Sequence, residues 1–205
     1  MRTKIIKQEI YSLDEVKNND ELLKKVLEKH HEINVYYDWW KCVYNGQKEK
    51  IEEIGFSINQ IYFSGFWSQG DGAMFEYNRI DDKLLNEFVD TLNLSPMRKQ
   101  WIINNIYISG KGHHRGHYNH EKCCSHSINW EVSNGDLHWS TYFYQWLESF
   151  ADEFEEFVVD KYEDLCSDLY RALEKEYDYL TSEESILESL ESNGYEFDIN
   201  GNITF

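Results

Sequence analysis

The sequence has little positive charge. Lys and Arg together number 20 against 38 Asp and Glu, which gives the 205-residue chain a net charge of −18 at pH 7. A protein that binds nucleic acid without sequence preference needs a surplus of Lys and Arg, because these residues displace counterions from the phosphates. An anionic membrane surface repels an acidic chain for a similar reason. We therefore expect no direct binding to duplex nucleic acid and no membrane partner.

Cysteines and long apolar runs are also scarce. Four cysteines are too few for a disulfide scaffold in a chain of this length, and the adjacent Cys123 and Cys124 suit no ordinary bridge between them. No run of residues has the apolar length of a signal-peptide core or of a membrane span. We expect reduced thiols and a cytoplasmic protein.

Large apolar side chains are abundant. The chain contains 7 Trp, 15 Tyr and 11 Phe, and 41% of its residues are hydrophobic, which is too much for a disordered acidic chain. At this length we expect a single domain over residues 1–205. The aromatic residues could fill one core or cover the interface of a homo-oligomer.

The negative charge is concentrated near the end of the chain. Between Glu148 and Asp198 there are 18 acidic and 3 basic residues, a net charge of −15, which leaves only −3 for the rest. This segment also contains apolar residues at helical spacing from Tyr142 to Leu180, as one long helix or a broken pair. Residues 142–193 are therefore predicted to form an acidic helical region.

The remaining patterns predict an α+β fold in which an antiparallel sheet packs against long helices. A capping box at Ser12 and Glu15 opens a helix that extends through Trp39, Trp40 and Val43, and Asn45-Gly46 ends it. A second, shorter helix ends at Gly55, and a third begins at Asp81 or Asp82. A fourth helix begins at Ser95-Pro96, with proline at its first position. Thr181 and Glu184 form the capping box of the last helix. Strands are predicted at residues 4–11, 57–67, 73–77 and 105–109, with hairpin turns at Asn134-Gly135 and, within a terminal hairpin over 194–205, at Asn200-Gly201.

The first candidate site is the turn from Ser64 to Ala73. Its glycines allow positive φ angles and a close approach of the backbone to a ligand, beside aromatic and polar side chains. The alternative is a glycine-rich hairpin loop whose aspartate caps its own backbone amides. The turn lacks the spacing of a Walker loop or of a dinucleotide motif. The candidate ligand-binding residues here are Phe66, Trp67, Ser68, Gln69 and Asp71.

The second candidate is the segment 112–126, GHHRGHYNHEKCCSH, which holds five of the eight histidines and two of the four cysteines. Such density makes zinc conceivable, but the spacing matches no known finger, and the alternative is an exposed polar loop. We expect no resident cofactor. Arg115, His117, Tyr118 and His120 are candidate ligand-binding residues, and Asp71, His117, His120 and Glu121 would be the catalytic set of a metal-assisted hydrolase.

The acidic helical region is the third candidate. Its carboxylates could imitate the phosphate spacing of nucleic acid and dock on a basic protein surface. The alternative is a solvated helix face. With 18 acidic and only 3 basic residues, however, most carboxylates of this segment have no basic residue to pair with at i,i+4 spacing.

Three segments carry a resemblance: FSGFWSQGDGA at 63–73, HYNHE at 117–121 and LCSDLYRALEKEYDYLTSEESILESLESNGYEFDINGNI at 165–203. With them the chain resembles a group of uncharacterised bacteriophage and prophage proteins, some of which are labelled antitoxins. The resemblance implies a phage accessory protein in the cytoplasm of an infected bacterium.

Phage accessory proteins of this size commonly act against host enzymes or host immunity. By that analogy we expect non-enzymatic binding that counters a host defence system. The partner would be a signalling nucleotide held by the glycine-rich turn, or a host defence protein docked on the acidic face. A metal-assisted hydrolase and an antitoxin-like neutralising protein are the alternatives.

Overall fold

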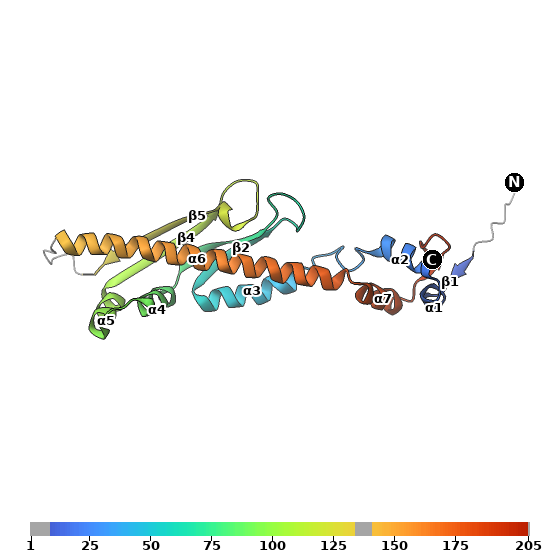
Figure 1. Cartoon of the computed structure of the whole chain (residues 1–205), viewed down its shortest axis with the longest axis horizontal. Coiled ribbons are helices and arrows are strands. Elements are labelled where there is room, and N and C mark those ends of the chain that lie inside the picture. Colours follow the sequence, from blue (N-terminus) through green and yellow to red (C-terminus); the bar gives the residue numbers. More distant parts are fainter. Residues whose placement is uncertain (1–8, 134–140, 205) are drawn as a thin grey trace. The chain divides into compact units, whose positions relative to one another are not determined.

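A computed structural model describes residues 9–133 and 141–204 (Figure 1). The fold is mixed α+β, as the sequence predicts. Contacts within the chain group it into two compact units. Of the described residues, 42–133 and 141–173 form the central unit, and 9–41 with 174–204 form the terminal unit. None of the helices in the described ranges combines the length and the hydropathy that a membrane span requires.

The central unit contains a four-stranded antiparallel sheet in the order β2-β3-β4-β5. Its strands are β2 (Phe56–Phe63), β3 (Ala73–Ile80), β4 (Ile106–His114) and β5 (Cys124–Val132). Residues 127–132, with the sequence SINWEV, lie in β5 and pair with β4. The hairpin turn predicted at Asn134-Gly135 lies outside the described residues.

Helices cover one face of this sheet. They are α3 (Lys41–Ile54), α4 (Asp82–Thr91), α5 (Pro96–Asn105) and the first part of α6 (Thr141–Leu180), which is one continuous helix. The apolar stripe of α6 includes Phe154, Val158 and Tyr162 and shares one core with sheet residues such as Phe56 and Phe75. Asp81 caps α4, as the sequence predicts.

The prediction that a helix ends at Asn45-Gly46 is wrong, because α3 continues through both residues to Ile54. A glycine inside a helix costs only about 1 kcal/mol, and burial of Gln47 and Ile51 on the same helix offsets it. The true end is at Gly55, whose φ of +126° is a conformation that side chains disfavour.

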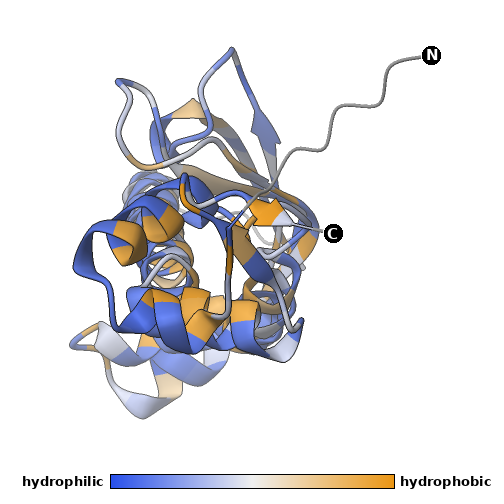
Figure 2. Ribbon diagram, turned by 90° about the vertical axis from the view of Figure 1, so that its right-hand side faces the viewer, coloured by the Kyte–Doolittle hydropathy of each residue, from blue (hydrophilic) through white to orange (hydrophobic). Residues whose placement is uncertain are grey.

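The terminal unit contains a small sheet in the order β1-β6-β7, formed by β1 (Ile10–Tyr11), β6 (Glu196–Asp198) and β7 (Ile203–Thr204). Its helices are α1 (Leu13–Lys17), α2 (Asp20–His30) and α7 (Glu183–Ser192). Their apolar faces form a second core, and Figure 2 shows hydrophobic and hydrophilic residues on different faces of the helices. The terminal hairpin is present, with Gly201 at a φ of +78°.

Two predictions on the helices of this unit are wrong. The helix expected from Ser12 to Val43 is divided into α1 and α2 of this unit and the start of α3, which belongs to the central unit. The capping box at Ser12 is present, but Asn19 begins a new helix by accepting a hydrogen bond from the Leu22 amide. The N-cap of α7 is Ser182 rather than Thr181, because the Thr181 hydroxyl donates back to the Tyr177 carbonyl at the end of α6.

Candidate functional site

Two loops of the central sheet lie side by side (Figure 1). The β2–β3 loop comprises residues 64–72 and the β4–β5 loop residues 115–123, and together we call them the loop end. A Cβ atom added to Gly72 would lie 2.6 Å from the Cβ of His120, and one added to Gly70 would lie 2.2 Å from the Tyr118 ring. The two candidate segments of the sequence therefore meet, and glycine is what allows their close approach.

Asp71 holds the β2–β3 loop in shape. One of its carboxylate oxygens accepts hydrogen bonds from the backbone amides of Trp67, at 2.9 Å, and Ser68, at 2.6 Å. The backbone follows this carboxylate closely, because Gly65 has a φ of +112° and a Cβ there would lie 3.1 Å from the same oxygen. This is the self-capping role that the sequence offered as the alternative to ligand binding.

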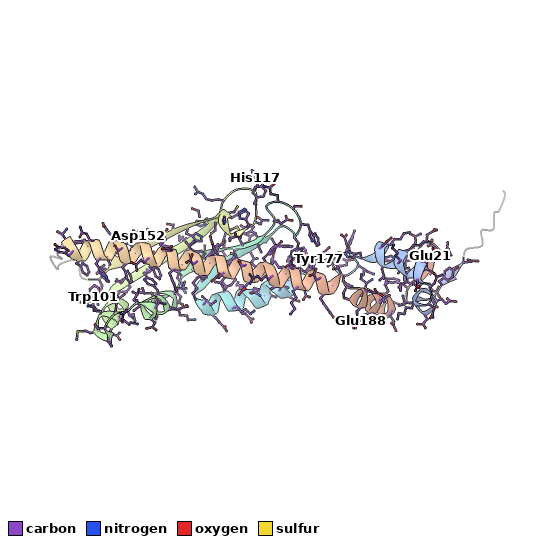
Figure 3. All side chains as sticks on the ribbon, viewed as in Figure 1. Glu21, Trp101, His117, Asp152, Tyr177 and Glu188 are labelled. Atoms are coloured by element: carbon purple, nitrogen blue, oxygen red, sulfur yellow. The ribbon has the colours of Figure 1, made fainter. Side chains whose placement is uncertain are left out.

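Aromatic side chains of the loop end divide into inward and outward groups. Phe66 packs against Phe63, with ring centroids 4.9 Å apart, and against Tyr170 of α6, at 5.5 Å. Trp67 is 76% exposed and Tyr118 is 54% exposed. The other predicted binding residues on the surface are Ser68, Gln69, Arg115 and His117, and Figure 3 shows His117 at the tip of its loop.

His114, at the end of β4, and His120, in the β4–β5 loop, both contact groups of that loop. His114 Nε2 lies 3.0 Å from the Tyr118 carbonyl oxygen, and His120 Nε2 lies 3.5 Å from Cys123 Sγ. Glu121 begins the short 3₁₀ helix η1 (Glu121–Cys123) and is half-buried. Within residues 9–133 and 141–204, no three His, Cys, Asp or Glu side chains gather in a group that could hold a metal.

Glu76 joins the strands beneath the loops, and sequence reasoning missed it. Its carboxylate accepts hydrogen bonds from the His114 backbone amide at 2.9 Å, the Tyr62 hydroxyl at 3.0 Å and the Asn59 amide at 3.3 Å. The bond from the His114 amide is the main reason that the pKa of Glu76 is lowered. Its place between the buried Phe75 and Tyr77 of β3 was the available signal, because alternate residues point to opposite faces.

A buried polar cluster lies between the sheet and α6. The Tyr77 hydroxyl is 2.8 Å from His126 Nδ1, and the Tyr162 hydroxyl donates to the Phe75 carbonyl at 2.9 Å. Burial raises the pKa of both tyrosines and of the thiols of Cys124 and Cys166. A thiol with a raised pKa stays protonated and is a poor nucleophile, so this cluster stabilises the core as a set of neutral groups.

Acidification from pH 7.5 to pH 5.5 is expected to lower the free energy of unfolding through His126. Burial lowers the pKa of this histidine from its usual 6.5. In this pH range the unfolded chain therefore binds more protons than the native protein does, and acidification favours unfolding. The contribution of neutral His126 to stability is therefore complete above about pH 6.5, and it is lost as the pH falls through the native pKa. Urea denaturation across this range measures the slope.

The matched variant for this test is His126→Gln, which cannot titrate. It should be less stable at pH 7.5, because Tyr77 loses its ring partner, but its stability should change less between pH 7.5 and 5.5. The lowered pKa of Glu76 places its own titration at more acidic pH. An unchanged pH slope in the variant would show that other groups cause the effect.

The solvent face of α6 carries the acidic stripe. Glu153, Glu156, Asp160 and Asp164 are exposed and follow one another at spacings of three or four residues. Two basic residues of this part of α6 already have partners, since Lys161 pairs with Glu87 and Arg171 with Asp168. Like charges at this spacing repel one another by a few tenths of a kcal/mol per pair.

The family described as Domain of unknown function (DUF8835) matches residues 39–183, more than half of the chain. The chain belongs to this family. The DUF8835 match includes the whole central unit, and with it the loop end, the buried polar cluster and the acidic stripe of α6. No curated protein and no solved structure matches the chain.

Proposed function

We propose that this DUF8835 protein is a phage-encoded accessory protein that counters a host defence system by binding a host protein without catalysis, and that the loop end is its binding surface. The supporting observation is that Trp67 and Tyr118 are exposed on two loops fixed against each other. The phage context rests on the sequence resemblance.

The chemistry of these side chains favours a protein partner. Trp, Tyr and Arg are the residues that contribute most at protein interfaces, and the loop end presents Trp67, Tyr118 and Arg115. The bonds to Asp71 and the close approach at Gly72 hold the backbone in place before binding. A preorganised surface loses less conformational entropy when it binds.

A binding role also agrees with how the candidate catalytic residues are used. Asp71 caps its own loop, His120 lies beside Cys123, and His117 stands at an exposed tip. A metal-assisted hydrolase would need Asp71, His117, His120 and Glu121 to converge on one point. The hydrolase alternative predicts that a chelator abolishes activity, whereas binding through the loop end survives chelation.

The combined substitution Trp67→Ala and Tyr118→Ala is expected to abolish anti-defence activity and to weaken the partner complex at least about thirtyfold. Native mass spectrometry of the protein purified from infected cells identifies the partner. Phage plating efficiency on hosts with different defence systems measures activity. The control is Tyr36→Ala, which removes from the terminal unit a ring that is 79% exposed, about as exposed as that of Trp67.

The acidic stripe of α6 is the second candidate surface, and a separate variant tests it. Changing Glu153, Glu156, Asp160 and Asp164 to their amides removes four exposed charges while keeping the side-chain shapes. If this variant, and not the aromatic one, loses activity, and if salt dissociates the complex strongly, the partner docks on the acidic stripe. A nucleotide in place of a host protein in the mass spectrum would overturn the choice of partner.

A further inference from the structure

A recess of the central unit lies far along the unit from the loop end. It is a cavity of about 390 Å³ at α5, the residues before it and the first turns of α6. Figure 3 shows Trp101, one of its lining residues, well apart from His117. The described residues that line it are Leu94, Arg98, Trp101, Ile102, Phe143 and Trp146.

The walls of the cavity are aromatic and arranged at angles to one another. The rings of Trp101 and Phe143 are 5.7 Å apart and nearly perpendicular, and those of Phe143 and Trp146 are 5.7 Å apart and tilted by 41°. Ile102, which also lines the cavity, is buried. A volume near 400 Å³ with apolar walls is within the range of small-molecule sites. Such walls fit a flat aromatic ring system.

One charged side chain lines the cavity together with these rings. Arg98 is the one charged residue among the described lining residues, and no described carboxylate forms an ion pair with it. It lies in the first turn of α5, a helix of ten residues, where the helix dipole adds positive potential. The neighbouring Lys99, by contrast, pairs with Asp90. In a protein with a net charge of −18, this positive position beside an aromatic cavity favours an anionic ligand.

We propose that this cavity binds a small planar aromatic acid. The ring system lies against the aromatic walls, and the carboxylate accepts hydrogen bonds from the Arg98 guanidinium, whose planar shape matches a carboxylate. This cavity shares no residue with the loop end. The experiment below therefore tests the ligand site independently of the proposed function of the loop end.

Two probes of the same size and different charge test the proposal on the full chain. 2-Naphthoate carries the carboxylate, and 2-naphthalenemethanol replaces it with a neutral alcohol. Titration calorimetry should show one site for the acid, with a Kd on the order of 100 μM, and about tenfold weaker binding of the alcohol. Arg98→Gln should weaken the acid about tenfold and leave the alcohol unchanged, whereas Trp146→Ala should weaken both.

The control variant is Arg79→Gln, which removes an exposed guanidinium from β3, outside the residues that line this cavity. It should bind both probes like the wild type. The proposal is overturned if the wild type binds the acid no better than the alcohol, if Arg98→Gln weakens both or neither, or if Trp146→Ala changes neither. Thermal melting of each variant separates a lost site from a lost fold.

Discussion

Tyr162→Ala is expected to cost about 3–5 kcal/mol of the free energy of unfolding, the amount typical of removing a buried aromatic ring. Tyr162 is fully buried in α6, and its ring lies 4.6 Å from the rings of both Phe75 and His126. Removing it leaves a cavity where the sheet meets the helix. A domain with a total stability of 5–15 kcal/mol would lose a large share.

The matched variant Tyr162→Phe keeps the ring and removes only the hydroxyl. It leaves the Phe75 carbonyl without the hydrogen bond that Tyr162 donates, so a loss of about 1 kcal/mol is expected. Urea denaturation followed by circular dichroism measures both variants. Equal losses in the two variants would mean that the hydrogen bond, and not the packing of the ring, carries the stability.

Gly72→Ala is expected to separate the two loops of the loop end. The added Cβ would lie 2.8 Å from the Cα of His120 and 3.2 Å from the carbonyl oxygen of Asn119. These are backbone atoms, which cannot move aside as the tip of a side chain can. We expect a loss of about 1–3 kcal/mol, the usual cost of overpacking, together with loss of binding at the loop end.

Gly46→Ala is the control for this prediction. Gly46 lies inside α3 and has no atom within 4 Å of the position of the added Cβ, so the variant should be as stable as the wild type or up to about 1 kcal/mol more stable. Hydrogen exchange at the amides of residues 64–72 reports on the loops directly. If Gly72→Ala leaves their protection unchanged, contact between the loops does not hold them in place.

Local patterns in the sequence were sufficient for much of the fold. The strands predicted at residues 57–67 and 73–77 are present as β2, which ends earlier at Phe63, and β3, which extends to Ile80. The spacing of Phe150, Phe154 and Leu165 predicted the helix α6. These patterns reflect which face of an element is buried, and burial is the strongest term in folding. The helix boundaries near Asn18, Asn45 and Thr181 were harder, because short side-chain hydrogen bonds and packing decide them at a cost of about 1 kcal/mol each.

The candidate site, too, was predictable from the sequence only in part. The sequence indicated both segments of the loop end and offered self-capping as one role for Asp71. It could not indicate that Glu76 would join β2, β3 and β4, since Tyr62, Glu76 and His114 are distant in the sequence. The cavity beside Arg98 was equally invisible, because Trp101 and Phe143 meet only when α5 packs near the start of α6.

The sequence by itself determined the α+β class, the long amphipathic helix and the concentration of negative charge between residues 148 and 198, because each depends on the order of side chains along one segment. Only the tertiary structure decided that Tyr118 and His120 lie against Gly70 and Gly72. It also decided that Asp71 accepts hydrogen bonds from its own loop and that Arg98 lies beside aromatic rings. These are distances between segments far apart in the chain. They are set by the pairing of strands and the packing of helices, which no local pattern encodes.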